Sequence, residues 1–433
     1  MYRWQISVVF PNMLRSKFHV YKIGFWILEI TVTLFTIYFL VNKLKNVNYH
    51  RLQQDLKITI KERPFYLGLT SLKEENLGPI NGNVTINREF FNFLSLNLHE
   101  TSYPGAENYT RYTVARLGLS PLVDVQPLIP ELGPVINDVL SFRYLFTVSP
   151  CVFNDGSLNK KVFVAVNSAT HKFGEREMIR QTWLKHLKNE IELGPIGIAG
   201  YGFFLGLTHD SETQRTIEKE SMQYGDIIQI GIYDFYRNLM LKKAGSFNWL
   251  HTNCIEVDYV LMIDDDVYVN VRKLANFVQS YNQSRIPTMF GSPPPPSGFG
   301  YFVTLREGKS EIPYEEWPWT HYPPYFNGPA VLITGSAILP LLACFQTTPM
   351  LLRAIDDVYN SGICPEKTGI KIHFSNDTLN FYNKEPPIGC ELRHVLAWNV
   401  LKPENFNKSH FETIDFYQRT HNTSNGLLLT HCN

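Results

Sequence analysis

Three consecutive aspartates, Asp264 to Asp266, interrupt an apolar stretch that runs from Val260 to Asn270. The residues before them, Val260 to Ile263, are of the types that form a buried strand. Three like charges at a strand end lower stability unless something neutralises them. Carboxylate oxygens suit Mg²⁺ or Mn²⁺, and open α/β sheets bind ligands beyond the carboxyl ends of their strands. The pattern therefore indicates a site for a metal and a phosphate, and a solvated acidic turn explains it equally well.

Two arginines follow an earlier predicted strand. Lys161 to Val166 predicts a short buried strand, and Glu175 to Trp183 predicts a helix. Arg176 and Arg180 lie near the start of that helix. A strand, a short loop and a helix with arginines near its start can bind phosphate. Ordinary solvated arginines are the alternative, and the local pattern alone favours them.

The elements that must position these residues alternate along the chain. Apolar runs of strand length are separated by longer polar or amphipathic runs of helical length. Strands are predicted at Gly202–Leu207, Gly225–Ile230, from Tyr259 and at Ala330–Thr334, and helices at Ser211–Tyr224, Tyr236–His251 and Arg272–Gln279. This alternation predicts an α/β fold with a Rossmann-like, mostly parallel sheet flanked by helices.

A segment dense in aromatic residues and proline, Glu315 to Tyr325, lies between two of these strands. Proline keeps such a segment out of helices and central strands. Its rings can stack on a sugar beside a polar cleft, or they can pin the loop to the core. The sequence favours neither interpretation.

Composition limits the class of protein. The 433 residues are enough for two or three domains, and a hydrophobic fraction of 44% supports a sizeable core. The formal net charge is zero. A chain of this balance has no broad basic surface for nucleic acid.

The N-terminal part contains one candidate membrane span, Ile23 to Val41. Glu29 weakens it, but no small-residue cleavage site follows, which favours a retained anchor over a cleaved signal peptide. Six glycosylation sequons and all six cysteines come after the span, which indicates a lumenal, oxidising location. Six cysteines allow 15 complete disulfide pairings. The predicted parts are a cytosolic tail (1–22), a transmembrane signal anchor (23–41), a lumenal stem (42–150) and a compact body (151–433).

Several motifs occur in a fixed order from about Lys161 to the C-terminus. They are Arg176–Trp183, Phe204–Gly206, Glu220–Lys242, Asp264–Val267, Tyr314–Gly328 and Asp356–Val358. Each motif is weak alone, but their joint order resembles the β-1,3-glycosyltransferase family. This family includes the β-1,3-galactosyl- and β-1,3-N-acetylglucosaminyltransferases, with the Fringe enzymes as more distant relatives.

The resemblance implies a GT-A-type catalytic domain behind a single transmembrane helix, in a type II protein of the Golgi membrane. It implies inverting transfer of a hexose or N-acetylhexosamine from a UDP-sugar to a hydroxyl of a glycan on protein or lipid, forming a β-1,3 linkage. It also implies roles for particular residues. These are Asp266 and Asp264 for Mn²⁺ or another divalent cation, Arg176, Arg180, Asp264 and Asp265 on the donor side, Asp357 as general base, and Trp317, Tyr322, Tyr325 and Gly328 on the acceptor side.

Some positions depart from the family pattern. Asp356 replaces the usual glutamate, and Ala330 follows Gly328 where the family has a second glycine motif. Asn399 stands where relatives have a metal-binding histidine, and His394 is out of register. Asparagine is a poorer transition-metal ligand. An inactive relative that binds glycans or acts as a chaperone therefore remains an alternative, whereas an unrelated metal-dependent hydrolase rests on the carboxylates alone.

Overall fold

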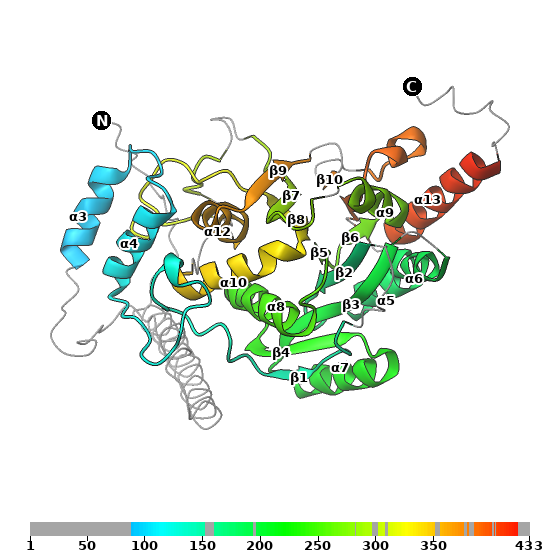
Figure 1. Ribbon diagram of the computed structural model, residues 1–433, viewed down its shortest axis with the longest axis horizontal. Coiled ribbons are helices and arrows are strands. Elements are labelled where there is room, and N and C mark those ends of the chain that lie inside the picture. The colour runs from blue at the N-terminus through cyan, green and yellow to red at the C-terminus, as the bar shows by residue number, and fades with distance from the viewer. Residues whose placement is uncertain are drawn as a thin grey trace, which may run out of the picture. The chain divides into compact units, whose positions relative to one another are not determined.

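The computed structural model describes residues 88–151, 160–193, 196–281, 283–296, 302–307, 311–350, 356–375, 379–380, 385–400, 402 and 404–422. The chain divides after Glu75, and all described residues belong to the second unit, Asn76–Asn433 (Figure 1). The predicted cytosolic tail and signal anchor lie outside the described residues. Within the described part of the chain, no helix is both long enough and apolar enough to cross a membrane.

An eight-stranded mixed sheet forms the centre of the second unit. In spatial order its strands are β1 (Tyr144–Phe146), β4 (Ile227–Tyr233), β3 (Ile196–Leu207), β2 (Lys160–Asn167), β5 (Tyr259–Asp264), β8 (Asn327–Thr334), β7 (Thr288–Ser292) and β9 (Lys371–Phe374). The block β4-β3-β2-β5 is parallel, as is the pair β7-β9. β1, β8 and the β7-β8 pair introduce antiparallel contacts. The predicted α/β class and mostly parallel sheet are therefore confirmed. The part of the sheet beyond β5 is mixed, because β8 runs antiparallel to both of its neighbours.

A smaller sheet lies beside the acidic triplet. It contains β10 (Leu379–Asn380), β11 (Ala397–Asn399) and β6 (Val267–Val269), in that order. β11 pairs antiparallel with β6, and β10 pairs parallel with β11. Because β6 starts directly after Asp266, this sheet brings the late part of the chain next to the triplet.

Helices cover both faces of the large sheet (Figure 1). They are α5 (Phe173–Gln181), α6 (Trp183–Leu193), α7 (Ser211–Tyr224), α8 (Leu239–Asn253), α9 (Val271–Ser280), α10 (Ile338–Thr347), α11 (Asp356–Val358), α12 (Cys364–Thr368) and α13 (Glu404–Asn422). On β2, Val162 and Val164 join the core cluster that contains residues of α5, α6 and α9. The alternate residue Phe163 packs on Trp249 of α8, with ring centroids 5.4 Å apart. Because β2 is buried on both faces, its sequence is a nearly continuous apolar run.

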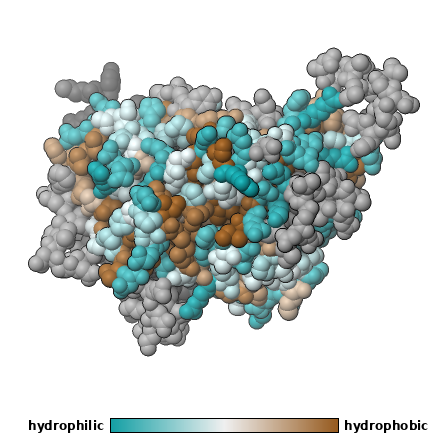
Figure 2. All heavy atoms as spheres, viewed as in Figure 1, coloured by the Kyte–Doolittle hydropathy of each residue, from teal (hydrophilic) through white to brown (hydrophobic). Residues whose placement is uncertain are grey.

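Hydrophobic side chains gather in the middle of the face along which α8 and α10 run (Figure 2). α10 has no acidic or basic residue in its end turns, and most of its side chains are buried. Phe247 of α8 and Phe345 of α10 meet edge to face, with ring centroids 5.5 Å apart. These two helices therefore form an apolar layer on one face of the sheet.

Two further helices precede the sheet, α3 (Arg88–Leu98) and α4 (Ala106–Leu117), within the region predicted as a stem. α4 packs against the rest of the unit through buried tyrosines. The Tyr109 hydroxyl donates to the Pro349 carbonyl at 3.0 Å, and the Tyr112 hydroxyl donates to the Glu315 carbonyl at 2.7 Å. The part of the predicted stem that the structure describes is thus packed on the same compact unit as the sheet.

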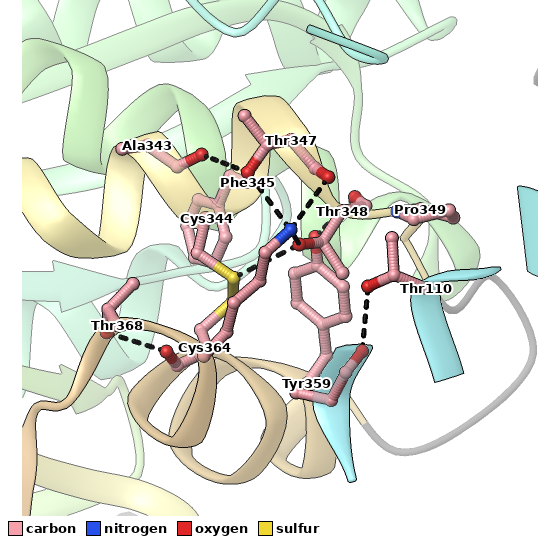
Figure 3. Close-up of a disulfide and its surroundings, with 12 residues drawn as sticks. Thr110, Ala343, Cys344, Phe345, Thr347, Thr348, Pro349, Tyr359, Cys364 and Thr368 are labelled. Atoms are coloured by element: carbon pink, nitrogen blue, oxygen red, sulfur yellow. Dashed lines mark hydrogen bonds between the residues drawn. A yellow bond between two sulfur atoms is a disulfide. The ribbon is translucent and has the colours of Figure 1, made fainter. Parts of the chain in front are cut away.

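Disulfides cross-link the unit, as expected for an oxidising compartment. Cys151 is bonded to Cys254, and Cys344 is bonded to Cys364. Cys390 is also disulfide-bonded. The second bridge joins α10 to α12 and so anchors the segment that begins with α11 (Figure 3).

The same segment is held at the carboxyl end of α10 (Figure 3). Lys367 donates from Nζ to the Thr347 carbonyl at 3.0 Å, and the Tyr359 hydroxyl donates to the Thr348 carbonyl at 2.7 Å. A cation near the last carbonyls of a helix is electrostatically favourable. These contacts fix α11 and α12 relative to α10.

Candidate active site

The acidic triplet lies at the carboxyl end of β5, as the sequence predicts. β5 ends at Asp264 and β6 starts at Val267, so Asp265 and Asp266 form the turn between them. Parallel pairing places Asn167, the last residue of β2, beside Asp264. The Asn167 amide donates to Asp264 Oδ1 at 3.0 Å. The hydrogen-bond partner of Asp264 on the neighbouring strand is therefore neutral.

Burial dominates the electrostatics of the triplet. It raises the pKa of Asp264 to about 7, although the Asn167 hydrogen bond and the Lys243 charge act in the opposite direction. Burial also raises the pKa of Asp265, and partial burial of the carboxyl group together with the Asp265 charge raises the pKa of Asp266, although much of that residue is exposed. Carboxylates whose ionised form is disfavoured in this way gain stability from a bound cation. The triplet therefore fits a hard divalent cation.

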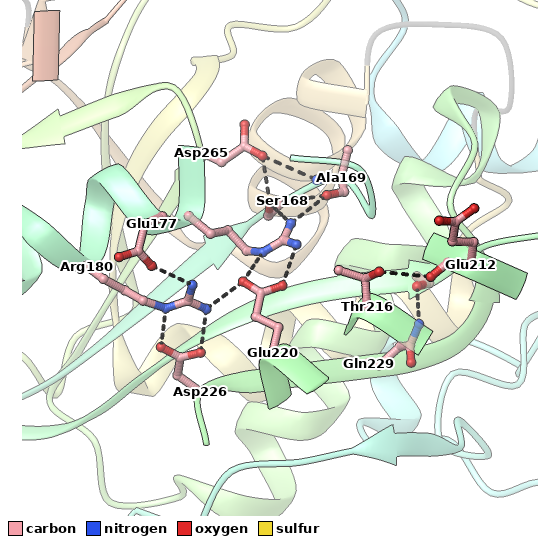
Figure 4. Close-up of polar contacts among 12 residues, drawn as sticks. Ser168, Ala169, Glu177, Arg180, Glu212, Thr216, Glu220, Asp226, Gln229 and Asp265 are labelled. Carbon is pink, nitrogen blue, oxygen red and sulfur yellow. Dashed lines mark hydrogen bonds and ion pairs between the residues drawn. The ribbon is translucent and has the colours of Figure 1, made fainter. Parts of the chain in front are cut away.

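Asp265 is turned toward the loop after β2 (Figure 4). Its Oδ2 accepts hydrogen bonds from Ser168 Oγ at 2.7 Å and from the Ala169 backbone N–H at 3.3 Å. Asp266, in contrast, is exposed. Asp265 therefore orients the loop, and Asp264 and Asp266 are the better candidates for a cation.

The two predicted arginines are buried and paired inside the protein (Figure 4). Arg176, which is 0% exposed, binds Glu220 through Nε at 2.9 Å and Nη2 at 2.7 Å. Arg180 binds Asp226 in the same two-pronged way, at 2.9 and 2.8 Å. The side chain of Arg176 is therefore enclosed and its charge is balanced by Glu220, and its donor-side role stays a prediction. Arg176 reaches the triplet through Ser168, to which its Nη1 donates at 3.0 Å.

Asp357 is fixed by contacts from two other elements. The Gly328 backbone N–H of β8 donates to Asp357 Oδ2 at 2.9 Å, and a Cβ at position 328 would overlap the carboxylate. Lys243 Nζ of α8 lies 2.6 Å from Asp356 Oδ2 and 3.3 Å from Asp357 Oδ1. Burial raises the pKa of Asp357 to about 6; the Asp356 charge adds to this effect and Lys243 opposes it. Asp357 therefore has the environment of a carboxylate that exchanges a proton near neutral pH.

Asp264 and Asp357 line one cavity of about 40 Å³. Asn167 lies in the same wall as Asp264, while Gly328 and Lys243 also contribute to the lining. The structure thus brings together three residues that the sequence predicts for different roles, Asp264, Asp357 and Gly328. A donor-side carboxylate and a second carboxylate suited to proton transfer meet at one place.

The aromatic segment is pinned to the core. Trp317 is fully buried and stacks on Tyr103, with ring centroids 5.3 Å apart, and lies 5.4 Å from the Tyr109 ring. Tyr322 and Tyr325 are 3% and 7% exposed. The faces of Trp317 are covered by protein rings in this structure, and its acceptor-side role stays a prediction. The alternative interpretation, a loop that packs on the core, describes this segment.

Asn399 lies beside the acidic triplet, in the position that the family register predicts. It pairs with Val267 across β11 and β6, and the next residue, Val400, donates its N–H to the Asp266 carbonyl at 2.7 Å. His394 lies outside β11. In the part of the chain that the structure describes, no three His, Cys, Asp or Glu side chains gather into a metal-binding group.

Three residues of the site were not predicted from the sequence: Asn167, Ser168 and Lys243. The only signal for the first two is their position directly after a predicted strand. Lys243 lies in a helix more than a hundred residues before Asp357, so only the tertiary fold brings the two together. A polar residue at a strand end and a lysine on a buried helix are too common to be selected on their own.

The α/β fold and the carboxylates define a broad class of proteins, which comparison with known proteins narrows. The sequence model of the galactosyltransferase family matches residues 174–376. Beta-1,3-galactosyltransferase 5 of Pan troglodytes is 27% identical over 250 residues, which cover 55% of this chain and 76% of that protein. Beta-1,3-galactosyltransferase 1 of Mus musculus is 27% identical, covering 73% and 90%.

A third relative is the lactosylceramide 1,3-N-acetyl-beta-D-glucosaminyltransferase A of Danio rerio. It is 28% identical over 52% of this chain and 60% of that protein. Among solved structures, the apo bifunctional glycosyltransferase WbbM matches 62% of this chain and 53% of that chain, with 8% identity and a TM-score of 0.33. The sequence matches confirm the predicted relationship: the chain is a relative of the β-1,3-glycosyltransferases, and its relatives support glycosyl transfer.

Proposed function

We propose that this protein transfers a hexose or N-acetylhexosamine from a UDP-sugar to a glycan hydroxyl, with inversion and formation of a β-1,3 linkage. The observation that carries the proposal is the cavity that Asp264 and Asp357 share. One carboxylate lies where a donor phosphate and cation are expected, at the carboxyl edge of the parallel strands. The other is suited to deprotonate an acceptor hydroxyl.

Asp357 acts as the general base. Its carboxylate accepts the proton of the acceptor hydroxyl while the hydroxyl oxygen bonds to the anomeric carbon. The bond between that carbon and the diphosphate breaks, and its electron pair leaves with UDP. A single displacement inverts the anomeric centre and needs no covalent nucleophile. The Gly328 N–H orients the base by binding Oδ2.

Asp264 and Asp266 would hold Mn²⁺ or another divalent cation. Carboxylate oxygens are the ligands that such a hard cation prefers, and a bound diphosphate would supply further oxygens. When bound, the cation stabilises negative charge on the departing diphosphate as a Lewis acid. Asp265 and Arg176 support this arrangement by fixing Ser168 between them.

We also propose that the body lies in the Golgi lumen behind a type II membrane anchor at Ile23 to Val41. The sequons and disulfides after that stretch support this location. The acceptor would be a glycan on a glycoprotein or a glycolipid. The Danio rerio relative carries a lactosylceramide acceptor in its name, which makes glycolipids a substrate class to include.

An inactive relative that binds glycans is the second candidate. Asn399 beside Asp266 favours it, because asparagine binds transition metals less well than histidine. Turnover separates the two candidates: the enzyme releases UDP in the presence of an acceptor, whereas a binding protein does not.

The test is a screen of the purified protein against UDP-sugars and glycan acceptors with Mn²⁺, followed by Asp357→Asn. This substitution keeps the shape of the side chain but removes the proton acceptor, so kcat should fall by about 10²–10⁴-fold with UDP affinity nearly unchanged. Asp210→Asn is the matched control, because Asp210 is an exposed helix N-cap and asparagine also caps helices. Full activity of Asp357→Asn would show that the base lies elsewhere. Absence of turnover with every donor would favour the binding protein.

A further inference from the structure

Lys243 is the cation of this site that the mechanism above leaves without a role. It projects from α8 toward Asp356 and Asp357, and its side chain is 19% exposed. Its ammonium lies between two carboxylates that are equally enclosed, with exposures of 17% for Asp356 and 16% for Asp357. One buried positive charge therefore serves two buried negative charges.

The distances show how the positive charge is divided. Nζ lies 2.6 Å from Asp356 Oδ2 but 3.3 Å from Asp357 Oδ1. The shorter contact makes Asp356 the main counter-ion of Lys243. Asp357 keeps one full negative charge and a weakly engaged Oδ1, which is the state that a proton acceptor needs.

The position of Asp357 is set from both sides. Gly328 binds Oδ2 through its N–H at 2.9 Å, and the lack of a Cβ there lets the backbone approach the carboxylate. Lys243 is within hydrogen-bond distance of the other oxygen. A carboxylate held through both oxygens by different elements, β8 and α8, cannot rotate without losing a contact.

We propose that Lys243 is a positioning residue for the transfer reaction, and that its ion pair with Asp356 holds Asp357 in place while leaving the negative charge of Asp357 unbalanced. This inference rests on the proposed function, in which Asp357 is the base. Lys243 touches no reacting atom and acts through Asp357. The shorter acid at position 356, which departs from the family pattern, is the partner that the arrangement uses.

The pair also keeps the proton transfer simple. Before the reaction the group of Lys243, Asp356 and Asp357 carries one net negative charge. When Asp357 takes the acceptor's proton, its own charge is neutralised, and Lys243 remains balanced by Asp356. No buried ammonium is left without a counter-ion at that stage, so the step avoids the large cost of an unpaired internal charge.

Lys243→Met removes the ammonium and leaves two adjacent carboxylates. We expect kcat to fall by about 10- to 100-fold, the scale of a small misplacement of a catalytic group, with UDP affinity within about twofold of wild type. The charge-balanced double variant Lys243→Met/Asp356→Asn should recover most of the lost kcat, because it restores the single net charge. Lys161→Met is the matched control, because Lys161 also pairs with one acid, Glu256 at 3.5 Å, on the strand end away from the site.

A purely structural role of Lys243 predicts a different result for the kcat values of the single and double variants. The double variant would then be no better than Lys243→Met, and thermal unfolding would follow the loss of activity. That result, or an unchanged kcat in Lys243→Met, overturns the inference while the proposed function stands.

A cycle with Asp357→Asn separates the inference from the function on which it rests. If Lys243 acts through Asp357, adding Lys243→Met to Asp357→Asn should change kcat by less than about threefold. An equal loss in both backgrounds rejects the positioning role although Asp357 is the base. Wild-type activity of Asp357→Asn rejects the base, and the inference fails with it.

Discussion

The carboxylates of the site differ in their partners. Asp264 accepts a hydrogen bond from the neutral Asn167, whereas Asp357 contacts the charged Lys243. Both are buried, and their pKa values are raised to about 7 and about 6. Distinct environments for two acids in one cavity are typical of sites that give the acids distinct roles. In the proposed reaction Asp264 binds a cation, and Asp357 accepts the proton of the acceptor hydroxyl.

The first prediction at this scale concerns pH. Because the pKa of Asp357 lies at about 6, the base is ionised above this pH and protonated below it. With Mn²⁺ saturating, kcat/KM for the acceptor should fall about tenfold per pH unit below about pH 6. UDP binding and tryptophan fluorescence at each pH serve as controls for donor binding and folding. A rate at pH 5 equal to that at pH 7 would argue against a base with this pKa.

A second residue-scale prediction concerns the metal. Asn399 lies opposite Val267, next to Asp266, where histidine would be a better ligand. Asn399→His should therefore lower the Mn²⁺ concentration needed for half-maximal turnover. His394→Asn is the control and should leave the titration unchanged, because His394 lies outside β11. An unchanged Mn²⁺ titration of Asn399→His would show that position 399 does not reach the cation.

At the scale of elements, the segment from α11 to α12 carries Asp357 and is fastened at several points. The Cys344–Cys364 bridge joins it to α10, and Lys367 and Tyr359 bind carbonyls at the end of that helix. Ser361 Oγ adds a hydrogen bond to the Asp357 carbonyl at 2.8 Å. The base therefore lies on a short element whose place depends on cross-links rather than on its own length.

Removal of each bridge tests this dependence. In the loop-entropy account, losing Cys344–Cys364, with a separation of 20, should lower the free energy of unfolding by about 3 kcal/mol. Losing Cys151–Cys254, with a separation of 103, should lower it by about 5 kcal/mol. Only the first pair of Cys→Ala substitutions should also lower kcat, under conditions where both variants are folded. Equal kcat for the two variants would mean that the bridge to α12 does not position the base.

The sequence predicts the secondary-structure elements better than the tertiary contacts between their side chains. The apolar runs that give β2 and β5 identify both strands and their carboxyl ends, because parallel strands are buried on both faces. The same reasoning does not locate Lys243, Asn167 or Ser168, since each acquires its role only from a neighbouring strand or helix. It does not reveal the ion pair of Arg176, because an arginine near a helix start looks alike in sequence whether it faces phosphate or a buried Glu220.

At the scale of the whole molecule, the region before the sheet is part of the described body. Tyr109 and Tyr112 of α4 surround Trp317 and Trp319 of the aromatic segment, with ring centroids 5.4 Å apart for two of these pairs. Proline and scattered polar residues in this region predict a stem. The packing of α4 is not evident from the sequence, because the rings that it covers lie some two hundred residues later. A helix whose packing partners lie so far along the chain gives little local sign that it is packed.

The final prediction tests whether α4 unfolds together with the sheet. Tyr109 is fully buried, contacts two tryptophan rings and donates to the Pro349 carbonyl. Removing a large aromatic side chain from such a place costs about 3–5 kcal/mol, so Tyr109→Ala should shift the denaturation midpoint of the whole body. Phe93→Ala is the control in the preceding helix; Phe93 is 64% exposed, and its loss should change stability by less than about 0.5 kcal/mol. Denaturant unfolding followed by tryptophan fluorescence and by far-ultraviolet circular dichroism measures both. If Tyr109→Ala unfolds at the wild-type midpoint, α4 is not part of the cooperative unit, and the region before the sheet behaves as the stem that its sequence suggests.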